Sequence, residues 1–217
     1  MKFAAFVVFA FLAFVVWAGS PVSFAADGHD LSSVNGSVTA SPGETYGTLN
    51  TVNGNVKVGS GVTAERAKTV NGEIDVGNNS KLGEVSTVNG SVDIGDDAEI
   101  ARNASTVNGG IEVGKRSRVG GDVTSVNGEI EIDGGEVGGQ IITSKGDIDL
   151  TDGARVLGGI HVKKNNNWGW NKDRPTEVHI CGSCVVEGEL RFDRPVELRV
   201  DQGAKIGKVI GDEVKRL

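Results

Sequence analysis

Apolar and polar residues alternate in short runs that recur at a nearly constant interval along the chain. Each run follows an Asn-Gly dipeptide and reads apolar, polar, apolar, as in Val56-Lys57-Val58 and Ile74-Asp75-Val76. Such alternation is typical of a β-strand with one buried face. Further apolar positions in each repeat, such as Val62 and Ala67, indicate two more short strands before the next Asn-Gly.

The repeat returns every 18 or 19 residues. Six copies of Thr-Val-Asn-Gly or Ser-Val-Asn-Gly mark it, with the structural asparagines Asn35, Asn53, Asn71, Asn89, Asn108 and Asn127. Ser144-Lys145-Gly146 fills the next slot in a degraded form. Three short strands per repeat predict one turn of a β-solenoid, with each strand paired in parallel to its copy about 4.8 Å away. The predicted fold is an all-β, single-stranded parallel β-helix with three-sided coils.

A hairpin-built sandwich is the rival interpretation of the same motif. Asn-Gly between alternating apolar residues is the strongest short-range signal for a two-residue β-hairpin turn. The segments upstream of the motif, such as 64–68 and 100–104, do not alternate cleanly. Hairpins also give no reason for a fixed 18-residue register. We therefore favour the solenoid.

Each residue of the motif has an expected role in the solenoid. The valine is expected to face the interior. Asn-Gly is expected to form the corner, because both residues tolerate left-handed backbone angles. Asparagines at the same slot of successive coils are expected to hydrogen-bond along the axis, as in other stacked β-structures.

The chain divides into four expected segments. Residues 1–25 are typical of a secretory signal peptide, with Lys2, an apolar run and the small-residue end Ser23-Phe24-Ala25. The apolar run of about 16 residues is shorter than the roughly 20 needed for a membrane span, so the mature chain is expected to lack one. We expect regular coils over 26–162, a polar loop with Trp168 and Trp170 over 163–175, and irregular C-terminal coils or a cap over 176–217.

Composition narrows the function classes. After residue 25 the chain has 21 basic and 29 acidic residues, a net charge of −8, and few aromatic residues. Its core must therefore be built from Val, Ile, Leu and Ala. The negative charge, together with export, disfavours nucleic acid as a partner.

Carboxylates occupy the outward positions of the strand after each Asn-Gly, where stacking would gather them on one face. They are Glu73, Asp75, Asp93, Glu112, Glu129, Glu131, Asp147 and Asp149. One interpretation is a solvated surface that keeps the protein soluble. The other is a face that binds a basic partner or a cation such as calcium, although the calcium-binding nonapeptide GGxGxDxUx is absent.

Two further features carry candidate chemistry. Cys181-Gly182-Ser183-Cys184 predicts a structural disulfide in an exported protein. Redox catalysis would require a strand-to-helix context, and a zinc site with His161 and His179 would lack a second paired motif. The two tryptophans of the polar loop can form an exposed pair that binds sugar or protein, or one can fold back and be buried.

The segments Thr87–Gly95 and Val119–Gly128 resemble two groups of bacterial β-solenoid proteins. One group is the exported adhesin-type solenoids, and the other is the bactofilins, which are polymer-forming β-helices. The resemblance covers roughly residues 33–162. It implies a right-handed β-helix and assigns no functional residues.

These features together predict an exported scaffold, periplasmic or on the cell surface, that displays polar and acidic faces to an envelope or surface polymer or protein. Self-association into filaments, as in bactofilins, is the first alternative. An enzyme that acts on polysaccharide is the second. We expect no catalytic residues and no cofactor, because the carboxylates follow the repeat instead of standing out from it.

Overall fold

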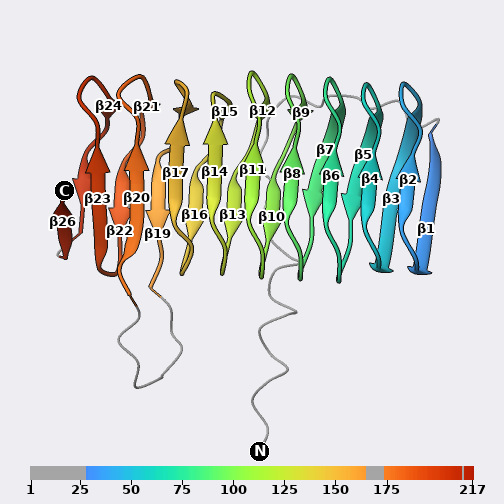
Figure 1. The fold of residues 1–217 in the computed structure, drawn as a ribbon, viewed down its shortest axis with the longest axis horizontal. Helices are drawn as coiled ribbons and strands as arrows, with labels where there is room; N and C mark the ends of the chain where they lie inside the picture. The colour runs from blue at the N-terminus through green and yellow to red at the C-terminus, as the bar shows by residue number, and fades with distance from the viewer. Residues whose placement is uncertain (1–27, 165–173, 212) are drawn as a thin grey trace, which may run out of the picture.

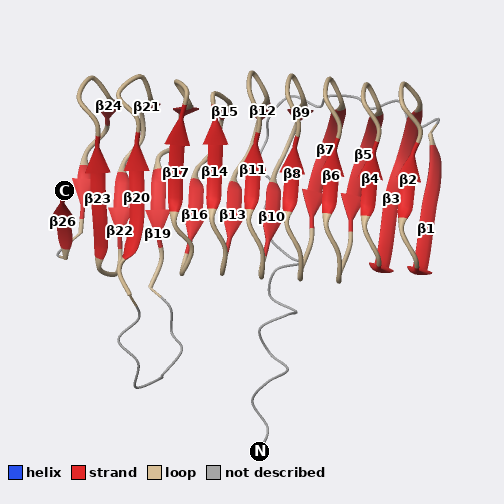
Figure 2. Cartoon of the chain, in the orientation of Figure 1, coloured by secondary structure: helices blue, strands red, loops and turns tan. Residues whose placement is uncertain are grey.

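The computed structural model describes residues 28–164, 174–211 and 213–217. These residues form an elongated solenoid whose coils stack along one axis, with β1 near one end and β26 at the other (Figure 1). All the regular structure in them is β-strand (Figure 2). Every strand pair in this part of the chain is parallel, which confirms the predicted β-solenoid and rules out hairpins. The predicted signal peptide, Trp168 and Trp170 lie outside the described residues.

One wall of the solenoid, which we call sheet B, contains ten strands, one from each coil. They follow the Asn-Gly slot and stack in chain order. In that order they are β2 (Val38–Ala40), β4 (Val56–Val58), β6 (Ile74–Val76), β8 (Val92–Ile94), β11 (Ile111–Val113), β14 (Ile130–Asp133), β17 (Ile148–Thr151), β20 (Thr176–Ile180), β23 (Val196–Val200) and β26 (Val214–Arg216).

The remaining strands form sheet A, which has 16 strands. In the first coils a single long strand precedes each Asn-Gly slot, namely β1 (His29–Asn35), β3 (Thr45–Asn53), β5 (Thr63–Lys68) and β7 (Lys81–Ser86). In later coils two short strands replace it. The first of each pair is β9 (Glu99–Ile100), β12 (Arg118–Val119), β15 (Glu136–Val137), β18 (Arg155–Val156), β21 (Val185–Val186) or β24 (Lys205–Ile206). The second is β10 (Ala104–Thr106), β13 (Val123–Ser125), β16 (Ile141–Thr143), β19 (Ile160–Val162), β22 (Leu190–Phe192) or β25 (Val209–Ile210).

A one-residue insertion accounts for the change from one strand to two. Strand β7 pairs with both successors, Leu82 with Ile100 and Val85 with Ala104. The first pair is separated by 18 residues and the second by 19, so the segment between Ile100 and Ala104 has one residue more than its counterpart in β7. The three predicted strands per coil are therefore distinct from β8 onward, whereas two of them merge in the N-terminal coils.

The interior is a set of stacked columns of Val, Ile, Leu and Ala, as the composition requires. One column of sheet B runs through Val56, Ile74, Val92 and Ile111, each directly above the last and almost completely buried. The two buried aromatic residues of the described chain, Tyr46 and Phe192, lie in early and late coils. Branched aliphatic residues pack well on a pleated surface and fit this narrow interior.

The predicted inward position of the motif valine is wrong. Val34, Val52 and Val70 are 66%, 38% and 41% exposed. The preceding threonine points inward instead, and Thr51 is fully buried. The side chains alternate along β3, so Leu49 and Thr51 share the inner face and Val52 must face outward.

The buried threonines close the corner by hydrogen bonding to the coil before. The Thr51 hydroxyl donates to the carbonyl oxygen of Gly36 at 2.8 Å, and the Thr87 hydroxyl donates to that of Gly72 at 2.9 Å. Thr69, Thr106 and Ser125 repeat the bond at 2.8–2.9 Å. Each motif thus satisfies one backbone acceptor of its neighbour, a role that the sequence interpretation had not assigned.

The corner glycine is required by close stacking, and the predicted left-handed backbone at Asn-Gly is wrong for the asparagine. A Cβ on Gly90 would lie 1.9 Å from the carbonyl oxygen of Gly72, so no side chain fits. None of the six motif asparagines has a positive φ. Left-handed residues instead occur at the opposite corner, after most of the sheet B strands, as at Asn79 (φ 60°) and Asp97 (φ 55°).

The asparagine side chains form a continuous ladder on the outside of the corner. Each Nδ2 donates to the Oδ1 of the asparagine one coil earlier, from Asn53 on Asn35 at 3.0 Å to Asn127 on Asn108 at 2.9 Å. The three bonds between these two measure 2.8 Å. The predicted asparagine ladder is present over six coils.

The C-terminal strands continue both sheets across a long insertion. Ile148 of β17 pairs with Val178 of β20, a step of 30 residues where the other coils take about 18 to 20. The extra residues include 165–173, which lie outside the described part. No helix among the described residues meets the length and hydropathy that a membrane span requires.

We predict that Thr87→Val destabilises the fold by about 1 kcal/mol, because it leaves the Gly72 carbonyl without its hydroxyl donor. The matched control is Thr124→Val, since Thr124 points outward from β13 and is half-buried. Chemical denaturation of both variants measures the difference. Equal free energies of unfolding would contradict the proposed role of the buried hydroxyl.

Candidate functional site

Five carboxylates lie in a single file on the outer surface of sheet B. The register pairs Asp75 with Asp93, Asp93 with Glu112, Glu112 with Glu131, and Glu131 with Asp149. Parallel pairing places them about 4.8 Å apart along the axis. We call this file the carboxylate column. It contains five of the eight acidic residues identified in the sequence.

The other three acidic residues lie on the adjacent outward positions, two residues earlier in each coil. They are Glu73, Glu129 and Asp147, and this second file also contains Ser91 and Gly110. Asp147 is held by an ion pair with Arg174 and accepts a bond from the Glu177 backbone at 2.9 Å. Glu129 is exposed. The outer face of sheet B is therefore densely acidic, and in the second file Asp147 is neutralised by an ion pair with Arg174.

Basic side chains close the carboxylate column at both ends. Lys57 precedes Asp75, while His179 and Arg199 follow Asp149 in the same file. The His179 ring contacts two carboxylates, with Nδ1 2.8 Å from Asp149 and Nε2 3.1 Å from Asp201. Both nitrogens can donate only when the ring is protonated. Protonated His179 would thus tie three successive coils together.

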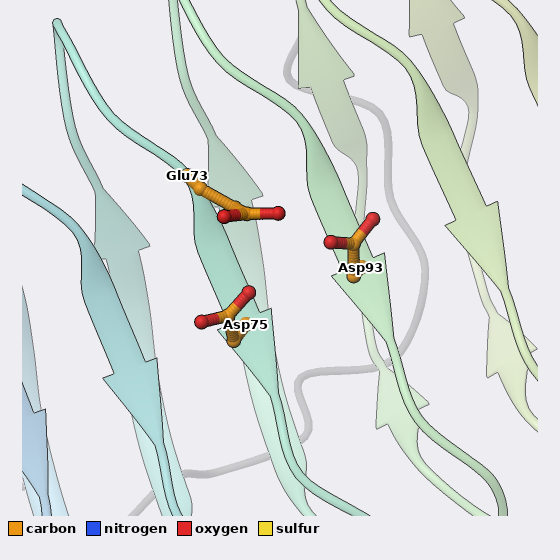
Figure 3. A group of neighbouring side chains, drawn as sticks. All are labelled: Glu73, Asp75 and Asp93. Carbon is orange, nitrogen blue, oxygen red and sulfur yellow. The ribbon is translucent and has the colours of Figure 1, made fainter.

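Glu73, Asp75 and Asp93 form the tightest group on this face. One carboxylate oxygen of each lies within 4.8 Å of the others, and all three side chains are half-buried. Figure 3 shows the three on one outer surface, Asp75 on β6 and Asp93 on the adjacent β8. The Ser91 hydroxyl donates to Glu73 Oε1 at 3.0 Å.

Burial and crowding change the protonation of this group. Burial, a hydrogen bond with Glu73 and the charges of Glu73, Glu112 and Asp75 raise the pKa of Asp93 to about 7. Hydrogen bonds from Asp93 and Ser91 lower the pKa of Glu73. Near neutral pH Asp93 is therefore about half protonated, and in its protonated form it donates to the Glu73 carboxylate.

The same causes act on other members of the column. Burial, and then the charge of Glu73, raise the pKa of Asp75. Burial, and then the charges of Glu112 and Asp149, raise the pKa of Glu131. The acidic charges of this face thus destabilise one another, as expected for like charges at directly opposed positions.

The three clustered carboxylates provide hard oxygen donors of the kind that calcium binds. They supply three side chains towards the six to eight oxygens of a calcium shell. Glu112, Glu129, Glu131, Asp147 and Asp149 do not join them, so the eight sequence candidates do not converge on one centre.

Sheet A shows the opposite arrangement of charge. Its outward file runs Lys81, Glu99, Arg118, Glu136 and Arg155, with the sign changing at each coil. Lys81 Nζ lies 3.9 Å from Glu99, and Arg155 lies 3.6 Å from Glu136. Arg118 also pairs with Glu136. We call this file the alternating column.

A disulfide joins Cys181 to Cys184, with a Cα–Cα distance of 5.2 Å. It spans the corner between β20 and β21, where the Cys184 amide donates to the Cys181 carbonyl at 3.0 Å. Cys184 is fully buried. His161 contacts Asp193 at 2.8 Å on sheet A, away from the disulfide corner. With both sulfurs bonded to each other, neither is a zinc ligand here.

Two hollows lie near the C-terminal end of the described solenoid. The larger, of about 520 Å³, is lined by Arg191, Phe192, Asp193, Arg194, Ile210, Gly211 and Glu213. The smaller, of about 200 Å³, is lined by Leu198, Val200, Ile206, Arg216 and Leu217. Neither hollow includes a residue of the carboxylate column.

We predict that the folded chain loses stability as the pH rises from about 5 to 7. The Asp93 carboxyl has a higher pKa in the folded chain than the usual value of about 3.9, so the folded state binds the proton more tightly in that window. Asp93→Asn cannot acquire the charge and should be more stable than the parent by about 1 kcal/mol at pH 8. Thermal unfolding at pH 5 and pH 8 measures both effects.

The control is Asp97→Asn, because a hydrogen bond from Arg116 lowers the pKa of Asp97. The same substitution there should not stabilise the chain at pH 8. If Asp93→Asn and Asp97→Asn shifted the melting temperature equally, the crowding of Asp93 would be refuted.

Comparison with known protein families, with curated proteins and with solved structures finds no match for this chain. The fold itself is a β-solenoid of parallel coils with a stacked asparagine ladder. The outer faces of sheets A and B are therefore the features that bear on its function.

Proposed function

We propose that the chain is an exported scaffold whose acidic sheet B face binds a cationic polymer or a protein with basic side chains at the cell envelope or surface. The carboxylate column is the observation that carries this proposal. It presents like charges at a fixed spacing on a rigid support, so a flexible polycation can contact several of them in succession. Repeated contacts raise the affinity well above that of one weak pair.

The contrast with the alternating column supports a binding role. Each carboxylate of that column has a base in a neighbouring coil, as Glu136 has Arg118 and Arg155. On sheet B, Asp93, Glu112 and Glu131 have no base within 4 Å among the described residues. The same repeat could hold alternating charges on both faces. The unneutralised file is destabilising by itself, and a basic partner would relieve it.

Export is part of the proposal. The sequence pattern of residues 1–25 supports it, and a disulfide such as Cys181–Cys184 persists in oxidising compartments. A periplasmic or surface location also places the acidic face within reach of envelope polymers.

Binding to linear polylysine tests the acidic face. We predict that the triple variant Asp75→Asn, Glu112→Gln and Glu131→Gln lowers the affinity at least tenfold in low salt. Three charge contacts at the protein surface, of about 0.5 kcal/mol each, account for that factor. Added salt should weaken the parent complex, since screening acts on exposed charges.

The control variant removes three charges from sheet A instead, with Glu99→Gln, Glu136→Gln and Glu187→Gln. Their partners are Lys81, Arg118 and Arg155. This variant has the same net charge as the first, so it should retain the affinity within about twofold. Equal losses in both variants would mean that polylysine senses only the total charge.

End-to-end assembly is a second candidate function, because the described solenoid has unpaired strand edges at both ends. Strands β2 and β26 are the outermost in sheet B, and sheet A ends at β1 on one side and at β24 and β25 on the other. Open edges promote pairing with another chain. Residues 28–56 contain Asp30 and Glu44 but no Lys or Arg, whereas residues 201–217 contain the bases Lys205, Lys208, Lys215 and Arg216 and the acids Asp201, Asp212 and Glu213.

Assembly predicts filaments whose axis is the solenoid axis. Electron microscopy and light scattering over a range of concentrations measure this directly. Monodisperse rods at every concentration would exclude the second candidate and leave the display of the acidic face. A polysaccharide-acting enzyme is the weakest alternative, since neither hollow described above adjoins the acidic face.

A further inference from the structure

The six Asn-Gly dipeptides have the same sequence but different hydrogen bonding. In the first four, the glycine N–H donates to the backbone carbonyl of the asparagine one coil later. The donors are Gly36, Gly54, Gly72 and Gly90, at distances of 2.9–3.1 Å. Each of these amides is held in the inter-coil backbone ladder.

The last two copies lack this bond. Within the described chain, the N–H groups of Gly109 and Gly128 donate to no backbone carbonyl. The Asn108 side chain still lies between two rungs, donating to Asn89 at 2.8 Å and accepting from Asn127 at 2.9 Å. Among the described residues, the Asn127 side chain makes only the bond to Asn108, because Lys145 occupies the next slot.

These differences matter because an Asn-Gly dipeptide can undergo an intramolecular reaction between its two residues. The glycine backbone nitrogen attacks the asparagine side-chain carbonyl carbon, an N–C bond forms, and ammonia leaves with the proton from the attacking amide. Water then opens the cyclic imide to aspartate or isoaspartate. The attack needs a glycine amide that is not engaged elsewhere and an asparagine side chain that can rotate towards it.

We propose that Asn127-Gly128 is a site of spontaneous deamidation in the folded protein, with Asn108-Gly109 reacting next and the first four copies protected. Asn127 is exposed, and among the described residues its glycine amide has no acceptor and one ladder bond restrains its side chain. Asn71 and Asn89 are each held by two ladder bonds and by the amide bond of the glycine that follows. Reaction there requires three bonds to open.

The product changes the end of the ladder. A carboxylate at position 127 has no N–H to donate, so the bond to Asn108 is lost and two oxygens face each other. Isoaspartate also adds a backbone atom to a corner where a Cβ on Gly128 would already lie 1.9 Å from Gly109. The new charge lies two residues from Glu129, so the acidic face gains a charge as the protein ages.

Peptide mapping by mass spectrometry tests the order of reaction. The purified chain is held at pH 8 and 37 °C, sampled over days and digested. We expect Asn127 to convert at least tenfold faster than Asn71 or Asn89, since two additional hydrogen bonds of ordinary strength supply that factor. The same chain in denaturant should convert all six sites at similar rates. Similar rates at all six sites in the native chain would overturn the proposal.

Lys145→Asn provides a second test, because it extends the ladder by one rung and creates a seventh Asn-Gly with Gly146. Asn127 then lies between two asparagines. We expect its conversion to slow several-fold while position 145 becomes reactive. An unchanged rate at Asn127, with the melting temperature of the parent, would show that the ladder end does not control the reaction.

Discussion

The fixed spacing between coils is the constraint on which the rest of the structure depends. Backbone hydrogen bonds between parallel strands hold neighbouring coils about 4.8 Å apart. Every side chain therefore meets the residue at the same slot one coil away, and contacts are almost entirely between neighbours. Each position of the repeat must therefore hold a side chain that can stack on the residues at the same position of the neighbouring coils. Apolar columns such as Val56, Ile74 and Val92 meet this requirement by burial, and the asparagine column meets it by donating and accepting along the axis.

Stacking brings like charges together when the same position holds the same charge in successive coils, which is destabilising. The two sheets differ in how their charges are arranged. On sheet A the sign alternates from Lys81 to Arg155, so every neighbour in the file is attractive. On sheet B five acids stack in succession, and the pKa of one of them, Asp93, is raised to about 7. The two faces share one backbone and one period. Their difference is therefore a property of the residues chosen for each face.

The period was sufficient to predict the fold, the strand after each Asn-Gly, the asparagine ladder and the files of acids. It was not sufficient to predict which side chains face inward before the Asn-Gly corner. The three residues from Asn53 to Asn55 interrupt the period of two, so the inward role of Thr51 could not be read from Val56 and Val58. The spacing of Leu49 and Thr51 did contain that signal. The contacts of Asp147 with Arg174 and of Asp149 with His179 span 27 and 30 residues, because the insertion breaks the repeat. Sequence spacing alone therefore could not identify them.

The insertion between β19 and β20 has a consequence of its own. Strands on either side of it pair in unbroken register, with Ile148 opposite Val178 and Ile160 opposite Leu190. A corner of the rod can thus carry a segment of unrelated length and composition without disturbing the coils. Such a corner is a site at which an inserted segment can join the solenoid. The rod can acquire, lose or exchange what it carries there, while the stacked frame that sets its position stays the same.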